Sequence, residues 1–121
     1  MKKFITLENG NQVLKEANSR QNYIAESGLI LVLDFAVSES YKIVLNENCN
    51  LSFLNFEGGA VYTLLVKQGV GNKTITFPVN VKWQGGNPPT LSTNTGKIDL
   101  ITLYYDDQED IFLGGSVTDY A

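Results

Sequence analysis

The sequence predicts an all-β protein with the architecture of an antiparallel, jelly-roll-like β-sandwich. Short segments rich in Val, Ile, Thr, Tyr and Phe recur at intervals of about 8–12 residues, as they do in sandwich folds. Clusters of glycine, asparagine and acidic residues separate these segments. Only Leu14–Ala25 has even a weak helical pattern, and Asn18, Ser19 and Asn22 interrupt it. We therefore expect one domain built from strands.

Ten segments are expected to form strands, and turn residues mark their ends. Glu57–Gly59 and Gly69–Asn72 predict tight turns, because glycine reaches the positive φ values that such turns need. Gln84–Pro89 predicts a loop, because its two prolines fit neither a central strand nor a helix interior. In chain order the predicted strands are Lys2–Leu7, Gln12–Lys15, Gly28–Phe35, Tyr41–Leu45, Asn50–Phe56, Ala60–Gln68, Lys73–Phe77, Val81–Trp83, Lys97–Tyr105 and Asp110–Leu113.

Three of these strands are apolar on both faces. Lys73–Phe77 shows the ordinary alternation of apolar residues with threonines. In contrast, Gly28–Phe35, Ala60–Gln68 and Lys97–Tyr105 carry large apolar residues on both faces. Because both faces must be covered and no convincing helix is available, further copies of the chain are the favoured cover. The alternative is that long loops cover these strands, or that they lie centrally in a tight sandwich. The residues expected at an interface between copies are Leu29, Leu31, Leu33, Val61, Leu65, Ile101, Leu103 and Tyr105.

The composition argues against several classes of function. The chain of 121 residues contains no histidine, which removes the commonest general base and the commonest metal ligand. Its single cysteine, Cys49, can form neither an internal disulfide nor a cysteine zinc cluster, and we expect it to be buried. The net charge of −4, without a basic stripe, argues against nucleic acid as a partner.

No segment is expected to enter a membrane. The longest apolar run, Leu29–Leu33, is far shorter than the roughly 18 residues that indicate a membrane span. The first residues imitate a signal peptide, but Glu8–Asn11 ends the apolar stretch before it reaches the roughly 7–15 residues of a secretory core. We therefore expect no export by a signal of the chain's own.

Ordered motifs run through about the last three quarters of the chain. They are the strand Val61–Gln68 before a glycine-containing turn, TITFP within Lys73–Pro78, VKW at Val81–Trp83, the pair Gly85-Gly86, PTLS at Pro89–Ser92, and IDLITLYYD at Ile98–Asp106. From Gly28 onward, this order resembles the C-terminal β-domain of bacteriophage fibre and other virion structural proteins. The resemblance implies a β-sandwich found at trimeric or other oligomeric sites of the virion, without catalytic residues to transfer.

The resemblance divides the chain into residues 1–27 and a β-sandwich virion domain over residues 28–121. In many relatives the domain ends a much longer protein, whereas here about 27 residues precede it. Lys2–Tyr23 is polar and weakly patterned. We expect it either to attach the protein to a capsid or tail surface, for example by adding a strand to a partner sheet, or to form the first strands of the same domain.

The densest acidic cluster lies at Asp106, Asp107, Glu109 and Asp110. Closely spaced carboxylates can bind Ca²⁺, but the ligand spacing and the glycine of a calcium loop are missing. The favoured interpretation is a solvated hairpin turn between the two flanking strands.

Two aromatic residues, Trp83 and Tyr120, are candidates for contact with a sugar ring. For Trp83, packing at a sandwich edge or subunit contact is the favoured alternative, because a Gly-Gly-Asn-Pro-Pro loop follows it closely. No pair of carboxylates stands out as the acid and nucleophile of a glycosidase. We therefore expect no enzymatic activity, no cofactor and no metal.

Taken with the resemblance, these observations predict a structural protein of the virion, assembled in the host cytoplasm. We expect a homotrimeric head-fibre or decoration protein, or a small tail-fibre component, that docks on the capsid or tail through its N-terminal segment. The alternative is a receptor-binding module that recognises a glycan or protein on the host cell surface.

Overall fold

The computed structural model describes residues 2–8, 11–17, 21–24 and 28–120, and within them it contains strands and a single turn of 3₁₀-helix. The prediction of an all-β fold is therefore confirmed. The elements are β1 (Lys2–Glu8), β2 (Asn11–Ala17), β3 (Gln21–Ile24), β4 (Ile30–Asp34), β5 (Ser40–Leu45), β6 (Cys49–Leu54), β7 (Val61–Gln68), β8 (Ile75–Thr76), β9 (Val81–Trp83), η1 (Gln84–Gly86), β10 (Ile98–Asp106) and β11 (Ile111–Tyr120).

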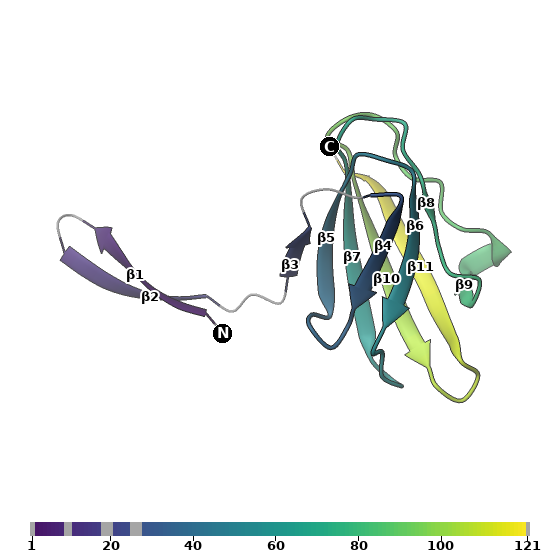
Figure 1. Cartoon of the computed structure of the whole chain (residues 1–121), viewed down its shortest axis with the longest axis horizontal. Coiled ribbons are helices and arrows are strands. Elements are labelled where there is room, and N and C mark those ends of the chain that lie inside the picture. Colours follow the sequence, from purple (N-terminus) through teal and green to yellow (C-terminus); the bar gives the residue numbers. More distant parts are fainter. Residues whose placement is uncertain (1, 9–10, 18–20, 25–27, 121) are drawn as a thin grey trace.

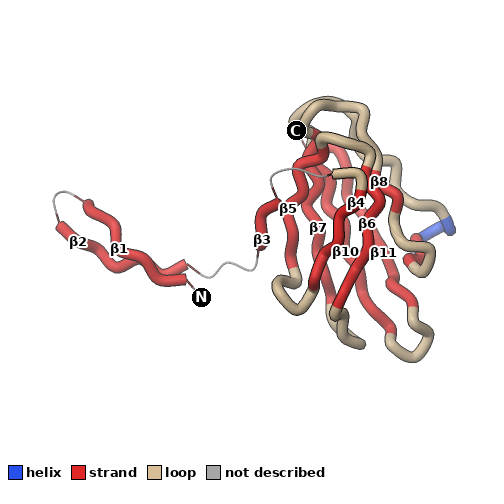
Figure 2. The backbone as a smooth tube through the Cα atoms, in the orientation of Figure 1, coloured by secondary structure: helices blue, strands red, loops and turns tan. Residues whose placement is uncertain are grey.

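Two sheets pack face to face to form a sandwich (Figure 1). The larger sheet has six strands in the order β3-β5-β7-β10-β11-β9, and the smaller has three in the order β4-β6-β8. A separate two-stranded sheet, β1-β2, lies beyond β3, away from the sandwich (Figure 2).

The expectation of a wholly antiparallel sandwich is wrong. Within the sandwich only β7-β10-β11 are antiparallel neighbours, whereas the pairs β3-β5, β5-β7, β4-β6, β6-β8 and β9-β11 are parallel. From β4 to β8 the chain changes sheet after every strand, so that successive strands of one sheet run in the same direction. Strand composition does not reveal this winding, because parallel and antiparallel strands draw on the same residue types.

The weak helical pattern of Leu14–Ala25 corresponds to no helix among the residues that the structure describes. Residues 14–17 belong to β2, which pairs antiparallel with β1 from Lys2↔Ala17 to Glu8↔Asn11. Residues 21–24 form β3, which pairs with β5; residues 18–20 and 25 lie outside the described part. The sequence signal for the hairpin is the dipeptide Asn9-Gly10 between the two strands, because Asn-Gly is typical of two-residue hairpin connections.

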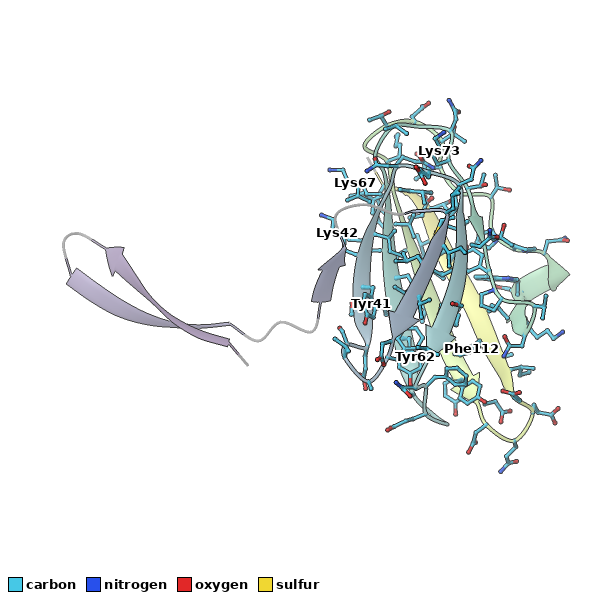
Figure 3. The ribbon with its side chains drawn as sticks, viewed as in Figure 1. Tyr41, Lys42, Tyr62, Lys67, Lys73 and Phe112 are labelled. Atoms are coloured by element: carbon cyan, nitrogen blue, oxygen red, sulfur yellow. The ribbon has the colours of Figure 1, made fainter. Side chains whose placement is uncertain are left out.

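The core lies between the two sheets. Alternation along each strand points one set of side chains inward, as in β5, where Tyr41, Ile43 and Leu45 are buried. One end of the core is aromatic: the Phe35 and Tyr62 rings stack with centroids 3.8 Å apart, and the Phe53 and Phe112 rings meet edge to face at 5.1 Å. Figure 3 labels Tyr41, Tyr62 and Phe112 at this end of the sandwich.

Two buried polar side chains tie loops to the sheet at the opposite end. The Gln68 side chain is 2% exposed and bridges the loop after β7, donating to the Lys73 carbonyl at 2.6 Å and accepting from its amide at 3.3 Å. The Asp99 carboxylate is 1% exposed and accepts from the Ser92 amide and hydroxyl, both at 2.7 Å, and from the Asp119 amide at 3.0 Å. Asp99 therefore fastens both the segment before β10 and the end of β11.

We predict that Asp99→Asn lowers the free energy of unfolding by about 1–3 kcal/mol, because the amide group turns one acceptor into a donor that faces the Ser92 or Asp119 donors. Urea denaturation followed by circular dichroism measures the change. Ser92→Ala serves as a control and should cost less, because it leaves the carboxylate with backbone donors. Unfolding of Asp99→Asn at the wild-type midpoint would contradict this role.

Candidate functional site

The candidate site is the outer face of the larger sheet, over β7, β10 and β11. Because residues of neighbouring strands lie opposite one another, they form four rows that run across the three strands, the fourth beyond a register shift between β10 and β11. We call these twelve residues the outer face; the rows are Val61-Tyr104-Leu113, Thr63-Thr102-Gly115, Leu65-Leu100-Val117 and Lys67-Ile98-Tyr120.

The outer face is apolar and exposed to a degree unusual for a protein surface. Large side chains in three of its rows are about half exposed: Val61 at 48%, Tyr104 at 44%, Leu113 at 51%, Val117 at 54% and Tyr120 at 46%. Lys67 is the only charged residue among the twelve. Depletion of charge together with exposed aromatic and aliphatic residues is the composition found in the centre of protein–protein interfaces.

The paired glycines of β11 differ in what surrounds them. A Cβ atom at Gly114 would lie 2.6 Å from ring atoms of Trp83, so that the Trp83 ring requires a glycine beneath it. A Cβ atom at Gly115 would meet nothing within 4 Å, and the φ angle of Gly115 is not positive. No contact or backbone angle within the described chain therefore requires glycine at position 115, although glycine weakens a strand interior and often marks a close approach of another backbone.

Of the eight residues predicted for an interface between copies, two lie on the outer face and six lie elsewhere. Val61 and Leu65 lie on the outer face. The others lie elsewhere: Leu33, Ile101, Leu103 and Tyr105 are buried in the core of one chain, Leu31 is partly buried against that core, and Leu29 is 68% exposed before β4.

The sequence could not decide which face of a two-faced strand points inward. On β10, Ile101 and Leu103 point inward, whereas Leu100 and Tyr104 point outward. Val117 was missed because the strand predicted at Asp110–Leu113 ends before it, whereas β11 extends to Tyr120. Leu113 lay within the predicted strand but was not among the interface candidates. The apolar residues Leu113, Val117 and Tyr120 were the available signal for this extension.

Trp83 and Tyr120, the candidates for a sugar contact, lie in different surroundings. The Trp83 ring is half-buried and packs edge to face against Phe77, with centroids 4.9 Å apart. Trp83 and Phe77 line an open groove of about 570 Å³ beside β8 and β9, together with Pro78, Val79 and Pro88. Tyr120 is not among the groove residues and closes one row of the outer face.

The acidic cluster forms the turn between β10 and β11, as predicted. Asp106 accepts hydrogen bonds from the Gln108 amide at 2.9 Å and the Glu109 amide at 3.4 Å, so that its carboxylate stabilises the turn itself. Asp110 accepts a hydrogen bond from the Tyr105 hydroxyl at 2.6 Å. This hydrogen bond, followed by burial and the nearby carboxylates, raises the pKa of Tyr105 to about 12.

Two further features bear on chemistry. Cys49 is buried, as expected, and burial raises the pKa of its thiol, which keeps the group protonated and unreactive at neutral pH. Within the described residues, no group of three or more His, Cys, Asp or Glu side chains is placed to hold a metal ion. In the same part of the chain, no helix is long and apolar enough to cross a membrane.

Comparison of the chain with protein-family models, curated proteins and solved structures gives no match.

We predict a loss of stability in alkali that depends on Tyr105. Because its folded-state pKa is about 12 and the ordinary tyrosine value is about 10, the stabilisation is complete below pH 10 and disappears as the pH rises to 12. The difference in free energy of unfolding between the wild type and Tyr105→Phe should therefore shrink across this interval. Denaturant titrations at pH 8, 10 and 12 measure it, and parallel curves for the two proteins would contradict the role of the hydrogen bond.

Proposed function

We propose that this chain is a structural protein of a bacteriophage virion, which assembles with copies of itself through the outer face of its larger sheet. Its sandwich is the assembly module, and its N-terminal hairpin is the piece that makes further attachments. In this proposal it works as a homotrimeric head-fibre or decoration protein or as a small tail-fibre component, without catalysis.

The observation that carries the proposal is the continuous apolar surface of the outer face. Three strands paired over about eight residues cover roughly 27 Å by 14 Å, or about 400 Å² in projection. A patch of this size is on the scale of the largest apolar patches of monomeric proteins, which are often functional. Three of its four rows are mainly apolar, and the row of Thr63, Thr102 and Gly115 lies between the first and the third.

A second copy of the chain is the occupant that the surface chemistry favours. An apolar face with one lysine among twelve residues offers little for a strongly charged partner to recognise. A copy brings an equally apolar face, and burying a Leu or Val side chain contributes about 1.5–3 kcal/mol. The virion as the setting rests on the resemblance of the motifs from Gly28 onward to phage fibre domains.

We predict that Leu113→Lys converts the oligomer into a folded monomer. The variant places a charge in the proposed interface, where an unpaired lysine costs several kcal/mol, so that the dissociation constant should rise at least about a hundredfold. Leu54→Lys is the matched control, because Leu54 is also 51% exposed but lies on the smaller sheet.

Light scattering at several concentrations measures the outcome. The wild type and Leu54→Lys should have three times the 13.4 kDa mass of one chain, and Leu113→Lys should have the mass of one. The proposal would be contradicted if the wild type were monomeric at every concentration, or if Leu113→Lys kept the mass of the wild type.

A second candidate function, recognition of a host surface glycan, is favoured by the groove beside β9. The groove exposes part of the Trp83 indole between proline and aromatic neighbours, and an aromatic face of this kind can stack on a sugar ring. Trp83 is the only tryptophan of the chain, so its fluorescence reports on the groove directly.

We predict that a glycan that binds this groove changes the Trp83 fluorescence in a saturable way. Lys82→Glu and Pro88→Ala, which alter residues that line the groove, should abolish this change. Unchanged fluorescence across a panel of glycans would contradict this second candidate function.

A further inference from the structure

One edge of the larger sheet is left open beside the outer face. β9 pairs with β11 only from Val81↔Phe112 to Trp83↔Gly114. The chain then turns away through η1, where Gly85 and Gly86 adopt φ angles of 76° and 85°. Among the described residues, no strand pairs with this edge of β11 beyond Gly114, although β11 continues to Tyr120.

Among the described residues, the open edge lacks charged residues, prolines and a covering strand, although the pairing of β11 with β10 shifts in register after Val117. Gly115–Thr118 contains no charge and no proline, and its residues are exposed apart from the half-buried Gly115. Only after it does Asp119 pair with Lys97 at 3.0 Å and bind the Asp99 carboxylate through its amide. Soluble proteins normally shield such an edge with charged residues, prolines or a covering segment.

The β1-β2 hairpin is an element that needs such an edge. In the part of the chain that the structure describes, its two seven-residue strands pair with each other and with no strand of the sandwich. A two-stranded hairpin by itself is marginally stable in water, and pairing with a third strand stabilises it. The hairpin has three basic and two acidic residues, whereas residues 28–121 have five basic and ten acidic ones, so that the charges favour contact between them.

The hairpin cannot pair with the open edge of its own chain. β3 and the position beyond β11 are separated by five strand spacings, or about 24 Å. The hairpin ends at Ala17 and β3 begins at Gln21, and this interval spans at most about 14 Å even when fully extended. Figure 1 shows the hairpin on the β3 side of the sandwich, opposite to β9. Any pairing between the two must therefore join two copies.

We propose that the β1-β2 hairpin of one copy adds to the open edge Gly115–Thr118 of a second copy, extending its six-stranded sheet. Backbone hydrogen bonds join the added strand to β11. The inference rests on the proposed self-assembly through the outer face and adds to it a second contact between copies, formed by the hairpin and the open edge. Because β3 and the open edge lie on opposite borders of one sheet, the contact is head-to-tail, and three copies can close it into a ring.

Crosslinking of the full-length chain tests this pairing. In a Cys49→Ala background, we compare Thr6→Cys/Ser116→Cys with the control Thr6→Cys/Ser52→Cys. Ser116 lies on the open edge and Ser52 on the smaller sheet, and both are exposed serines. A short bismaleimide should link the Ser116→Cys variant into covalent dimers and higher species at least about tenfold faster than the control, because pairing raises the effective concentration of the thiols.

Each other outcome has a separate meaning. Equal crosslinking of the two variants, while light scattering still shows an oligomer, would overturn the hairpin inference and leave self-assembly through the outer face intact. A link formed within one chain would overturn the pairing between copies. A monomer without crosslinks would overturn both the inference and the proposed function. Val13→Cys, at the position paired with Thr6, replaces Thr6→Cys if that variant changes the circular dichroism spectrum.

Discussion

The structure depends on a single apolar core that lies between two sheets, and the chain contributes strands to the two sheets alternately. From β4 to β8 each strand is followed by one in the opposite sheet, so that every strand must give one face to the same interior. This winding accounts for the parallel pairing within each sheet. The stacked rings of Phe35, which follows β4, and Tyr62, which lies in β7, join the two sides of the sandwich.

The core uses one face of each central strand and leaves the other available. In the larger sheet, the inward residues of β10 fill the interior, while Leu100, Tyr104 and their neighbours on β7 and β11 form a second apolar surface outside. A chain of this size with a fully buried core has no folding requirement for that second surface. The proposed association with a second copy gives it a physical reason, because burial in a contact removes apolar area from water.

The polar anchors and the glycines shape where association can occur. Asp99 holds the end of β11 against the segment before β10, and β11 remains exposed where its partner β9 has ended. Gly114 accommodates the Trp83 ring on the inner side, whereas Gly115 leaves space on the outer side. The outer face and the open edge therefore meet at one place on β11, and a single neighbour can contact both.

The sequence by itself determined the all-β class, the positions of nearly all strands and turns, and the presence of strands that are apolar on both faces. It could do so because residue type and two-residue alternation are local properties. Only the tertiary structure decided which face of each strand is buried, that the sheets contain parallel pairs, and that β11 continues to Tyr120 with an open edge. These features depend on which distant strands lie beside and beneath each strand. Leu100 and Ile101 are equally apolar in sequence, and only the packing of the smaller sheet against one face of β10 buries Ile101 rather than Leu100.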